Sequence, residues 1–263
     1  MFEIDVISAI ALTAAGVAAG FVNTLAGGGM MITLPVMVFI GLPETLANGT
    51  SRFGILFQAS SSAWAYYKKG VLNLERIKLV VPPVLVGAIV GAFAGANLPD
   101  HVFRFLFGGV MVVFAALLLK KPSKTDGEVS STLSPRFYSP WARWLILVPV
   151  GLYGGMIQAG MGYVVLGALT LGFRFTLMEA NILKVALIGA YTPVVVAIFL
   201  GHGELNILVG ALLAVGQATG AWFGAHLALE RGVGLVRAML LTVIVISSMQ
   251  LFGVWAWLFG LAG

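Results

Sequence analysis

An uncharged run over residues 6–43 constrains this chain more than any other feature. Three consecutive glycines, Gly27, Gly28 and Gly29, interrupt this otherwise apolar run. Inside a helix each glycine costs about 1 kcal/mol relative to alanine, and in lipid the freed backbone groups must be satisfied by protein or by a cavity. The run therefore predicts a helix that breaks at the glycines and a second helix from Met30, whose positive end faces the break and suits an anion. The alternative is that the glycines only let another helix pack closely.

The composition predicts a helical membrane protein with several spans. Of the 263 residues, 60% are hydrophobic and 10% are charged, whereas a soluble domain carries about 25% charge. A transmembrane barrel would show short alternating segments instead. The chain has no cysteine, which excludes disulfide and thiolate chemistry. Most basic residues fall in predicted loops, which is a topology signal and not the footprint of a nucleic-acid partner.

Apolar stretches divide the chain into two halves joined by one polar segment. We predict a first membrane repeat over residues 1–119, a cytoplasmic linker over 120–143 and a second membrane repeat over 144–263. Each half is predicted to contain a glycine-broken helix or hairpin followed by three transmembrane helices. The predicted helical segments are 6–22, 30–41, 45–67, 79–99 and 102–119 in the first half, and 144–173, 180–200, 205–229 and 238–263 in the second, with 144–173 broken at Gly160-Met161-Gly162.

The two halves match each other at one constant offset. Asn48 falls on Asn181, 133 positions later, and Arg104 falls on Arg237 at the same offset. Such duplications are usual in secondary transporters, whose substrate site lies at the repeat interface. The halves are parallel if each broken segment crosses the membrane once, and inverted if each turns back as a hairpin. The inverted arrangement puts 12 of the 13 Lys and Arg outside the spans on one side, against 9 in the parallel one, so the positive-inside rule favours it.

Arg52 and Lys184 are each the only charge in a predicted span. A basic residue near mid-membrane costs at least about 2.5–3.5 kcal/mol and normally faces a cavity or a partner. Asn48 lies four residues before Arg52 and Asn181 three before Lys184, which puts each amide and cation on one helix face. We interpret the two cations, the two amides and the two breaks as the surroundings of one bound anion.

The alternative is that both cations snorkel to an interface or pair with Glu44 and Glu179 near the span ends. Glu44, Glu179 and His226 are also candidates for proton coupling. We predict no enzyme, because the sequence has no P-loop, no full dinucleotide fingerprint and only three scattered histidines, and it calls for no metal and no cofactor. The remaining candidates for substrate binding lie at or near the breaks: Gly27, Gly28, Gly29, Gly160, Gly162, Gln158 and Ser51.

One series of motifs has a counterpart in a known family. It runs Gly20-Phe21-Val22-Asn23-Thr24-Leu25-Ala26-Gly27-Gly28-Gly29, then Leu34-Pro35, Leu42-Pro43 and Ala47-Asn48-Gly49-Thr50-Ser51. This series resembles the sulfite exporter TauE/SafE family, also called the toluene sulfonate uptake permease family. The second half departs from the pattern, since Gly160-Met161-Gly162 lacks the middle glycine. The resemblance implies secondary transport of sulfur-containing anions such as sulfite, sulfonates or organosulfur acids, with export the commoner direction.

We therefore predict a secondary anion transporter of the bacterial inner membrane that works by alternating access. Its predicted partners are a small anionic substrate, the lipid bilayer, a coupling proton or sodium ion and a second copy of the chain in a homodimer, with no nucleic acid. The alternative function is a non-transporting membrane assembly protein that holds a partner with its helices.

Overall fold

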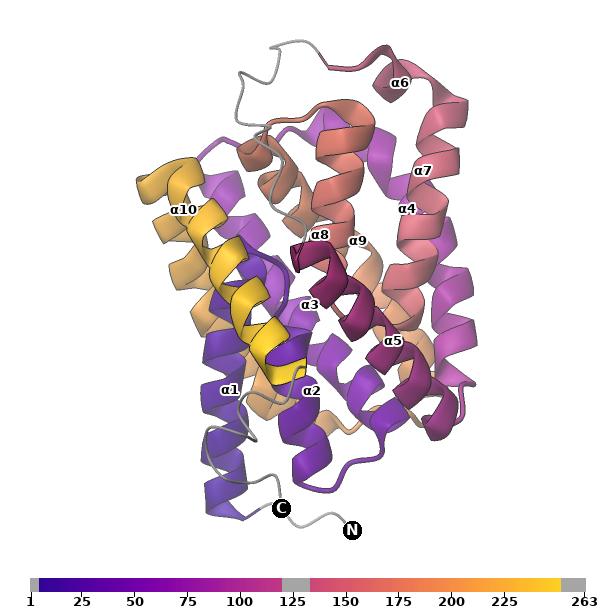
Figure 1. The fold of residues 1–263 in the computed structure, drawn as a ribbon, viewed down its shortest axis with the longest axis vertical. Coiled ribbons are helices and arrows are strands. Elements are labelled where there is room, and N and C mark those ends of the chain that lie inside the picture. The colour runs from indigo at the N-terminus through magenta and orange to yellow at the C-terminus, as the bar shows by residue number, and fades with distance from the viewer. Residues whose placement is uncertain (1–4, 120–132, 252–263) are drawn as a thin grey trace.

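The structure is a computed structural model that describes residues 5–119 and 133–251, with side chains described over 5–109 and 133–231. The elements of these residues are helices, and most of them run along the long axis of the molecule (Figure 1). In chain order they are α1 (Val6–Leu25), α2 (Met30–Phe39), α3 (Glu44–Lys68), α4 (Leu74–Ala96), α5 (Asp100–Leu119), α6 (Pro135–Tyr138), α7 (Pro140–Met156), α8 (Met161–Gly167), a π-helical turn η1 (Ala168–Gly172), α9 (Leu177–Gly201) and α10 (Ile207–Leu251).

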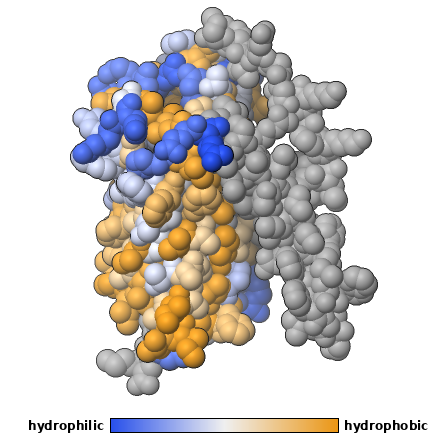
Figure 2. Space-filling view, turned by 90° about the vertical axis from the view of Figure 1, so that its left-hand side faces the viewer, coloured by the Kyte–Doolittle hydropathy of each residue, from blue (hydrophilic) through white to orange (hydrophobic). Residues whose placement is uncertain are grey.

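Four of these helical segments are long and apolar enough to cross a membrane, namely α1, α4, α9 and the first part of α10, over Ile207–Arg231. Figure 2 shows apolar side chains covering the lower two thirds of one face, below a cluster of hydrophilic ones. These features agree with the helical membrane protein that the composition predicts.

Both predicted helix breaks are present. The first lies between α1 and α2, where Gly27 has a φ of +100°, and α2 begins at Met30 as predicted. The second lies between α7 and α8, where Gln158 and Gly160 both have a φ of +64°. The second break starts earlier than predicted, because Gln158 takes up one of the two left-handed positions, and Gly162 already belongs to the first turn of α8.

Two glycine-rich seams hold helices from different halves together. On α10, a Cβ at Gly220 would overlap the carbonyl oxygen of Val17 in α1. On α4, a Cβ at Gly91 would overlap the carbonyl oxygen of Leu152 in α7. Neighbouring glycines repeat these contacts in register one turn earlier and later, so α1 runs parallel to α10 and α4 parallel to α7. Small residues allow such close approach of helices in a membrane protein.

Between these two pairs, α3 and α9 lie side by side and run antiparallel. The amide of Asn181, early in α9, donates to the hydroxyl of Tyr66 near the end of α3, whereas Gly49 near the start of α3 packs against Phe199 late in α9. Further contacts show that α3 runs parallel to α10 and α4 parallel to α9. Consequently α1, α3 and α10 run one way, and α4, α7 and α9 run the other.

These directions place the broken segments and the charges. α1 and α3 both start at the lower end of Figure 1, so α2 leads from the first break back to the lower end. Likewise, α8 and η1 lead from the second break back to the upper end, where α9 starts. Among side chains that the structure describes, the acids Asp5, Glu44, Asp100 and Glu204 lie at the lower end with the single base Arg104, and the upper end carries Lys68, Lys69, Arg76, Lys78, Arg136, Arg143, Arg174 and Arg231.

Two predicted boundaries differ from the structure. Residues 205–229 and 238–263 were expected as separate spans; the helical assignment of α10 is unbroken from Ile207 to Leu251, but its last part turns back at the upper end and descends across the front of the molecule (Figure 1). The charged residues from 230 to 237 interrupt the apolar pattern, yet they include no proline that would end a helix. The last part of the predicted linker 120–143 contains α6 and the start of α7, since Pro140 suits the first position of a helix; the division of the chain into two repeats and a linker stays a prediction. Residues 120–132 and 252–263 lie outside the described part of the chain.

Candidate functional site

Arg52 lies in α3, and its side chain is fully buried. Its Nη1 donates to the carbonyl oxygen of Gly154 and to Oε1 of Gln158, and its Nη2 donates to Oδ1 of Asn48 at 3.1 Å. Gly154 belongs to the last turn of α7, so the guanidinium lies at the negative end of that helix. The ring of Phe199 covers the guanidinium with its centroid 5.1 Å away. The Nε of Arg52 is buried and has no hydrogen-bond partner among the described residues.

Lys184 lies in α9 and is also fully buried. Its Nζ donates to the carbonyl oxygens of Asn23 at 3.0 Å and Thr24 at 3.2 Å, and to Oδ1 of Asn181 at 2.8 Å. Both carbonyls belong to the last turn of α1, which again is a negative helix end. An ammonium group has three N–H donors, so each of them has an acceptor here.

The two sites are reciprocal. Each cation comes from one half of the chain and binds the end of the broken helix in the other half. The breaks themselves touch, because a Cβ at Gly27 would overlap the backbone of Gly162, and the reverse is also true. The structure thus joins each predicted amide–cation pair to a predicted break. Direct binding of a substrate by these residues stays a prediction.

The two cations lie at different depths along α3 and α9. Arg52 lies beside Phe199, and Tyr66 lies beside Asn181. Counting along this antiparallel pair, Lys184 lies opposite a position about 12 residues beyond Arg52 on α3, which is roughly 18 Å at the rise of an α-helix. Each cation is therefore associated with its own break. For both to bind a single small anion, as expected from the sequence, the helices would have to move so that the two cations come closer together.

The alternative in which carboxylates neutralise the buried cations is wrong for the described residues. Glu44 forms an ion pair with Arg104, and Glu179 forms one with Arg76 at 2.6 Å. The third ion pair among these residues lies on the surface of α4. Complete burial also excludes snorkelling, so both cations stand in the interior without a carboxylate partner.

Neutral polar side chains extend from the first break. The amide of Asn23 donates to Oε1 of Gln58 at 2.6 Å, and Oγ1 of Thr24 lies 2.8 Å from the hydroxyl of Ser62. Oδ1 of Asn23 accepts from the backbone N–H of Gly29 at 3.5 Å. The hydroxyl of Ser51, a predicted ligand, instead donates to the carbonyl of Asn48 within its own helix.

Sequence reasoning missed three members of this interior network: Asn23, Tyr66 and Tyr191. Asn23 stands inside the glycine motif, and that position was its only available signal. Tyr66 stands with Trp64 and Tyr67 before two lysines, a pattern typical of an interfacial aromatic belt, but it is fully buried and accepts from the amide of Asn181. Tyr191 donates to Oε1 of Gln158 at 3.3 Å. Neither tyrosine has a sequence signature that separates it from other aromatic residues.

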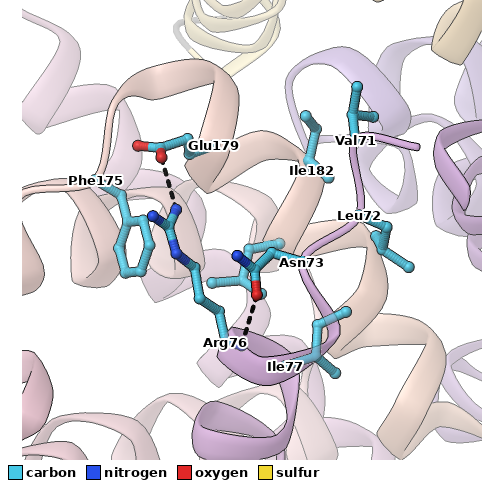
Figure 3. A pocket seen from close by; sticks show the side chains of 9 residues that line it. Val71, Leu72, Asn73, Arg76, Ile77, Phe175, Glu179 and Ile182 are labelled. Carbon is cyan, nitrogen blue, oxygen red and sulfur yellow. Dashed lines mark hydrogen bonds and ion pairs between the residues drawn. The ribbon is translucent and has the colours of Figure 1, made fainter. Parts of the chain in front are cut away.

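A pocket of about 230 Å³ opens at the upper end, between the starts of α4 and α9. Figure 3 shows the guanidinium of Arg76 between the carboxylate of Glu179 and the ring of Phe175, whose centroid is 5.3 Å away. Glu179 also closes a capping box with Thr176 at the start of α9, so it is held from two sides. The lining residues are Val71, Leu72, Asn73, Arg76, Ile77, Phe175, Glu179, Ile182 and Leu183, the last of which directly precedes Lys184.

The candidates for proton coupling lie away from the breaks. Glu44 and Glu179 each hold an arginine, as described above. His226 lies late in the first part of α10, where its Nδ1 is 2.8 Å from the carbonyl oxygen of Trp222 and its ring lies against that indole. A coupling role for these three residues stays a prediction.

These observations define a class: a helical membrane protein with two helix breaks in its interior and a buried cation bound at each. The chain belongs to the sulfite exporter TauE/SafE family, whose model matches residues 12–251. The resemblance seen in the sequence motifs is thereby confirmed.

Several curated relatives resemble the chain over most of its length. A probable membrane transporter protein of Sinorhizobium sp. is 29% identical over 240 residues, which cover 89% of this chain and 88% of the relative. Probable membrane transporter proteins of Haemophilus influenzae and Escherichia coli are 25% and 24% identical over 236 residues, covering 89% of this chain and 89% and 85% of the relatives. No solved structure matches. The family and the names of these relatives indicate a membrane transporter and not an enzyme.

Proposed function

We propose that this chain is a secondary transporter that exports small sulfur-containing anions, such as sulfite, sulfonates or organosulfur acids, across the bacterial inner membrane. The observation that carries the proposal is the fully buried Arg52, which has no carboxylate partner among the described residues and has an unbonded Nε beside a helix break. A buried charge without a counter-charge is expensive, and in a transporter an anionic substrate supplies the missing charge.

We also infer that the two halves are inverted repeats. Support comes from the helix directions, since α1 and α7, α3 and α9, and α4 and α10 each run in opposite directions. Further support comes from the described bases, which gather at the upper end and therefore mark it as cytoplasmic by the positive-inside rule. The same rule places the acidic end of Glu44 and Asp100 outside.

The packing of the helix pairs supports the proposed alternating-access mechanism. The α1–α10 pair and the α4–α7 pair are each tightly joined by a glycine seam, and they meet at the contact of Gly27 with Gly162. We infer that the two pairs rock against each other around this contact. Such rocking exposes the region of the breaks first to one end and then to the other.

The test is transport by the purified protein in proteoliposomes. We expect the unchanged protein to move sulfite or methanesulfonate, and Arg52→Ala to lower the rate at least tenfold while the protein still inserts. Lys78→Ala is the control, because this lysine pairs with Glu75 on the exposed surface of α4, and its rate should stay within about twofold. Normal transport by Arg52→Ala contradicts the site, and no movement of any sulfur anion by the unchanged protein contradicts the proposed function.

A further inference from the structure

We propose that Arg52 alone contacts the transported anion, through the edge of its guanidinium that carries Nε, and that Lys184 is a positioning residue that holds the end of α1. This inference rests on the proposed function. It assigns different roles to two residues that occupy nearly equivalent places in the two halves.

The assignment for Lys184 follows from its donors. All three N–H groups of the ammonium have acceptors at 2.8–3.2 Å, and these acceptors are two carbonyls of α1 and the side chain of Asn181. Asn181 is itself fixed, because its amide donates to Tyr66. An anion that contacted Nζ would have to displace one of these buried acceptors and leave it unsatisfied.

The donors of Arg52 are not all used. A guanidinium has five N–H donors. Nη1 donates to Gly154 and Gln158, Nη2 donates to Asn48, and the buried Nε lacks an acceptor among the described residues. A buried charged donor without an acceptor is rare in folded proteins, so the geometry points to a group from outside the chain that fills this position.

The shape of the free edge identifies the chemical class of the ligand. Nε–H and an N–H of Nη2 form a planar fork that matches two oxygen atoms of one sulfite, sulfonate or carboxylate group. A halide offers one spherical acceptor that both N–H groups must share, so it matches the fork less well than two oxygen atoms do. Gly154, Gln158 and Asn48 hold the other donors, and the ring of Phe199 covers the plane, so the fork is oriented before the anion arrives. We therefore expect selectivity for oxyanions over chloride.

The experiment places the same new charge beside each cation. In Asn48→Asp a carboxylate takes the position of the amide that accepts from Arg52, and Asn181→Asp makes the identical change beside Lys184. Each substitution keeps the shape and loses one amide donor bond. Binding of methanesulfonate to the purified full-length protein in detergent is measured by thermal shift. We expect the apparent Kd to rise at least tenfold in Asn48→Asp and less than threefold in Asn181→Asp.

A second measurement uses the unchanged protein and so does not depend on how the variants fold. Methanesulfonate and sulfite should raise the melting temperature at concentrations where sodium chloride does not. Equal stabilisation by chloride overturns the fork. Equal losses of affinity in the two variants, or a larger loss in Asn181→Asp, overturn the division of roles between Arg52 and Lys184. The proposed function still stands in that case if the unchanged protein transports the anion. If the unchanged protein neither binds nor moves a sulfur oxyanion, the proposed function fails and this inference falls with it.

Discussion

At the scale of single residues, the interior cations show what a sequence reveals and what it hides. Arg52 and Lys184 were predicted because a lone charge stands out in an apolar run. Half of their partners were not, because three of the six are carbonyl oxygens from the other half of the chain. Every residue has a carbonyl, so only the packing of the halves decides which ones are bound.

Tyr66 shows a second limit of the same kind. It stands beside Trp64 and Tyr67, which are 58% and 55% exposed, and all three precede a lysine pair as a membrane belt would. Successive residues of a helix point about 100° apart, so Trp64 and Tyr67 share a face on which Tyr66 does not lie. The packing of the helices decides which face of α3 is buried against α9, and Tyr66 lies on that face.

The contact between the breaks gives a prediction for Gly27. In Gly27→Ala the new Cβ would overlap the backbone of Gly162, and the residue would have to keep a φ of +100°. We expect loss of the folded protein or a fall of at least about 3 kcal/mol in stability, since overpacking adds to the backbone strain. The measurement is the thermal midpoint of detergent-purified protein.

Gly70→Ala separates the effect of backbone strain from the effect of the overlap with Gly162. Gly70 also has a positive φ, +69°, but no atom lies within 4 Å of a Cβ placed there. The strain alone costs about 1–2 kcal/mol. Equal effects of the two substitutions would show that the contact with Gly162 contributes nothing.

At the scale of elements, the broken helices and most spans were predictable, because glycine runs and apolar stretches act locally. The first helix break and the start of α2 follow from the sequence. The pairing of the helices could not be predicted from the sequence, since the seams join α1 to α10 and α4 to α7 across the two halves. Glycine-rich faces such as those at 87–95 and 216–224 suit close helix contact, but the sequence does not name the partner; in the structure α7 covers the first and α1 the second.

Substitution in a seam should therefore act on folding. In Gly91→Val the side chain would overlap the carbonyl of Leu152 and push α4 away from α7. We expect the stability to fall by about 3 kcal/mol or more. Gly109→Val in α5 is the control, because a Cβ there meets no atom of the described residues within 4 Å, and its effect should stay within about 0.5 kcal/mol. A thermal midpoint for Gly91→Val that equals the control's would rule out a tight seam.

At the scale of the whole molecule, the described charges give the fold a direction. Among the described side chains, one end carries eight bases with three acids, Glu75, Glu179 and Glu230, and the other carries a single base with four acids. With the basic end in the cytoplasm, a phosphatase reporter inserted after Gly127 should be inactive, and one fused after Gly263 should be active outside. Activity in the reverse pattern, or a cytoplasmic C-terminus, is incompatible with inverted halves.

The seam between α1 and α10 also sets an order of events during synthesis. Gly16 and Gly216, which pack against each other, are 200 positions apart in the chain. At about 5–20 residues per second, α1 leaves the ribosome on the order of 10–40 s before its partner. Its glycine groove stays without this partner throughout that interval, so the seam closes only after α10 has been synthesised.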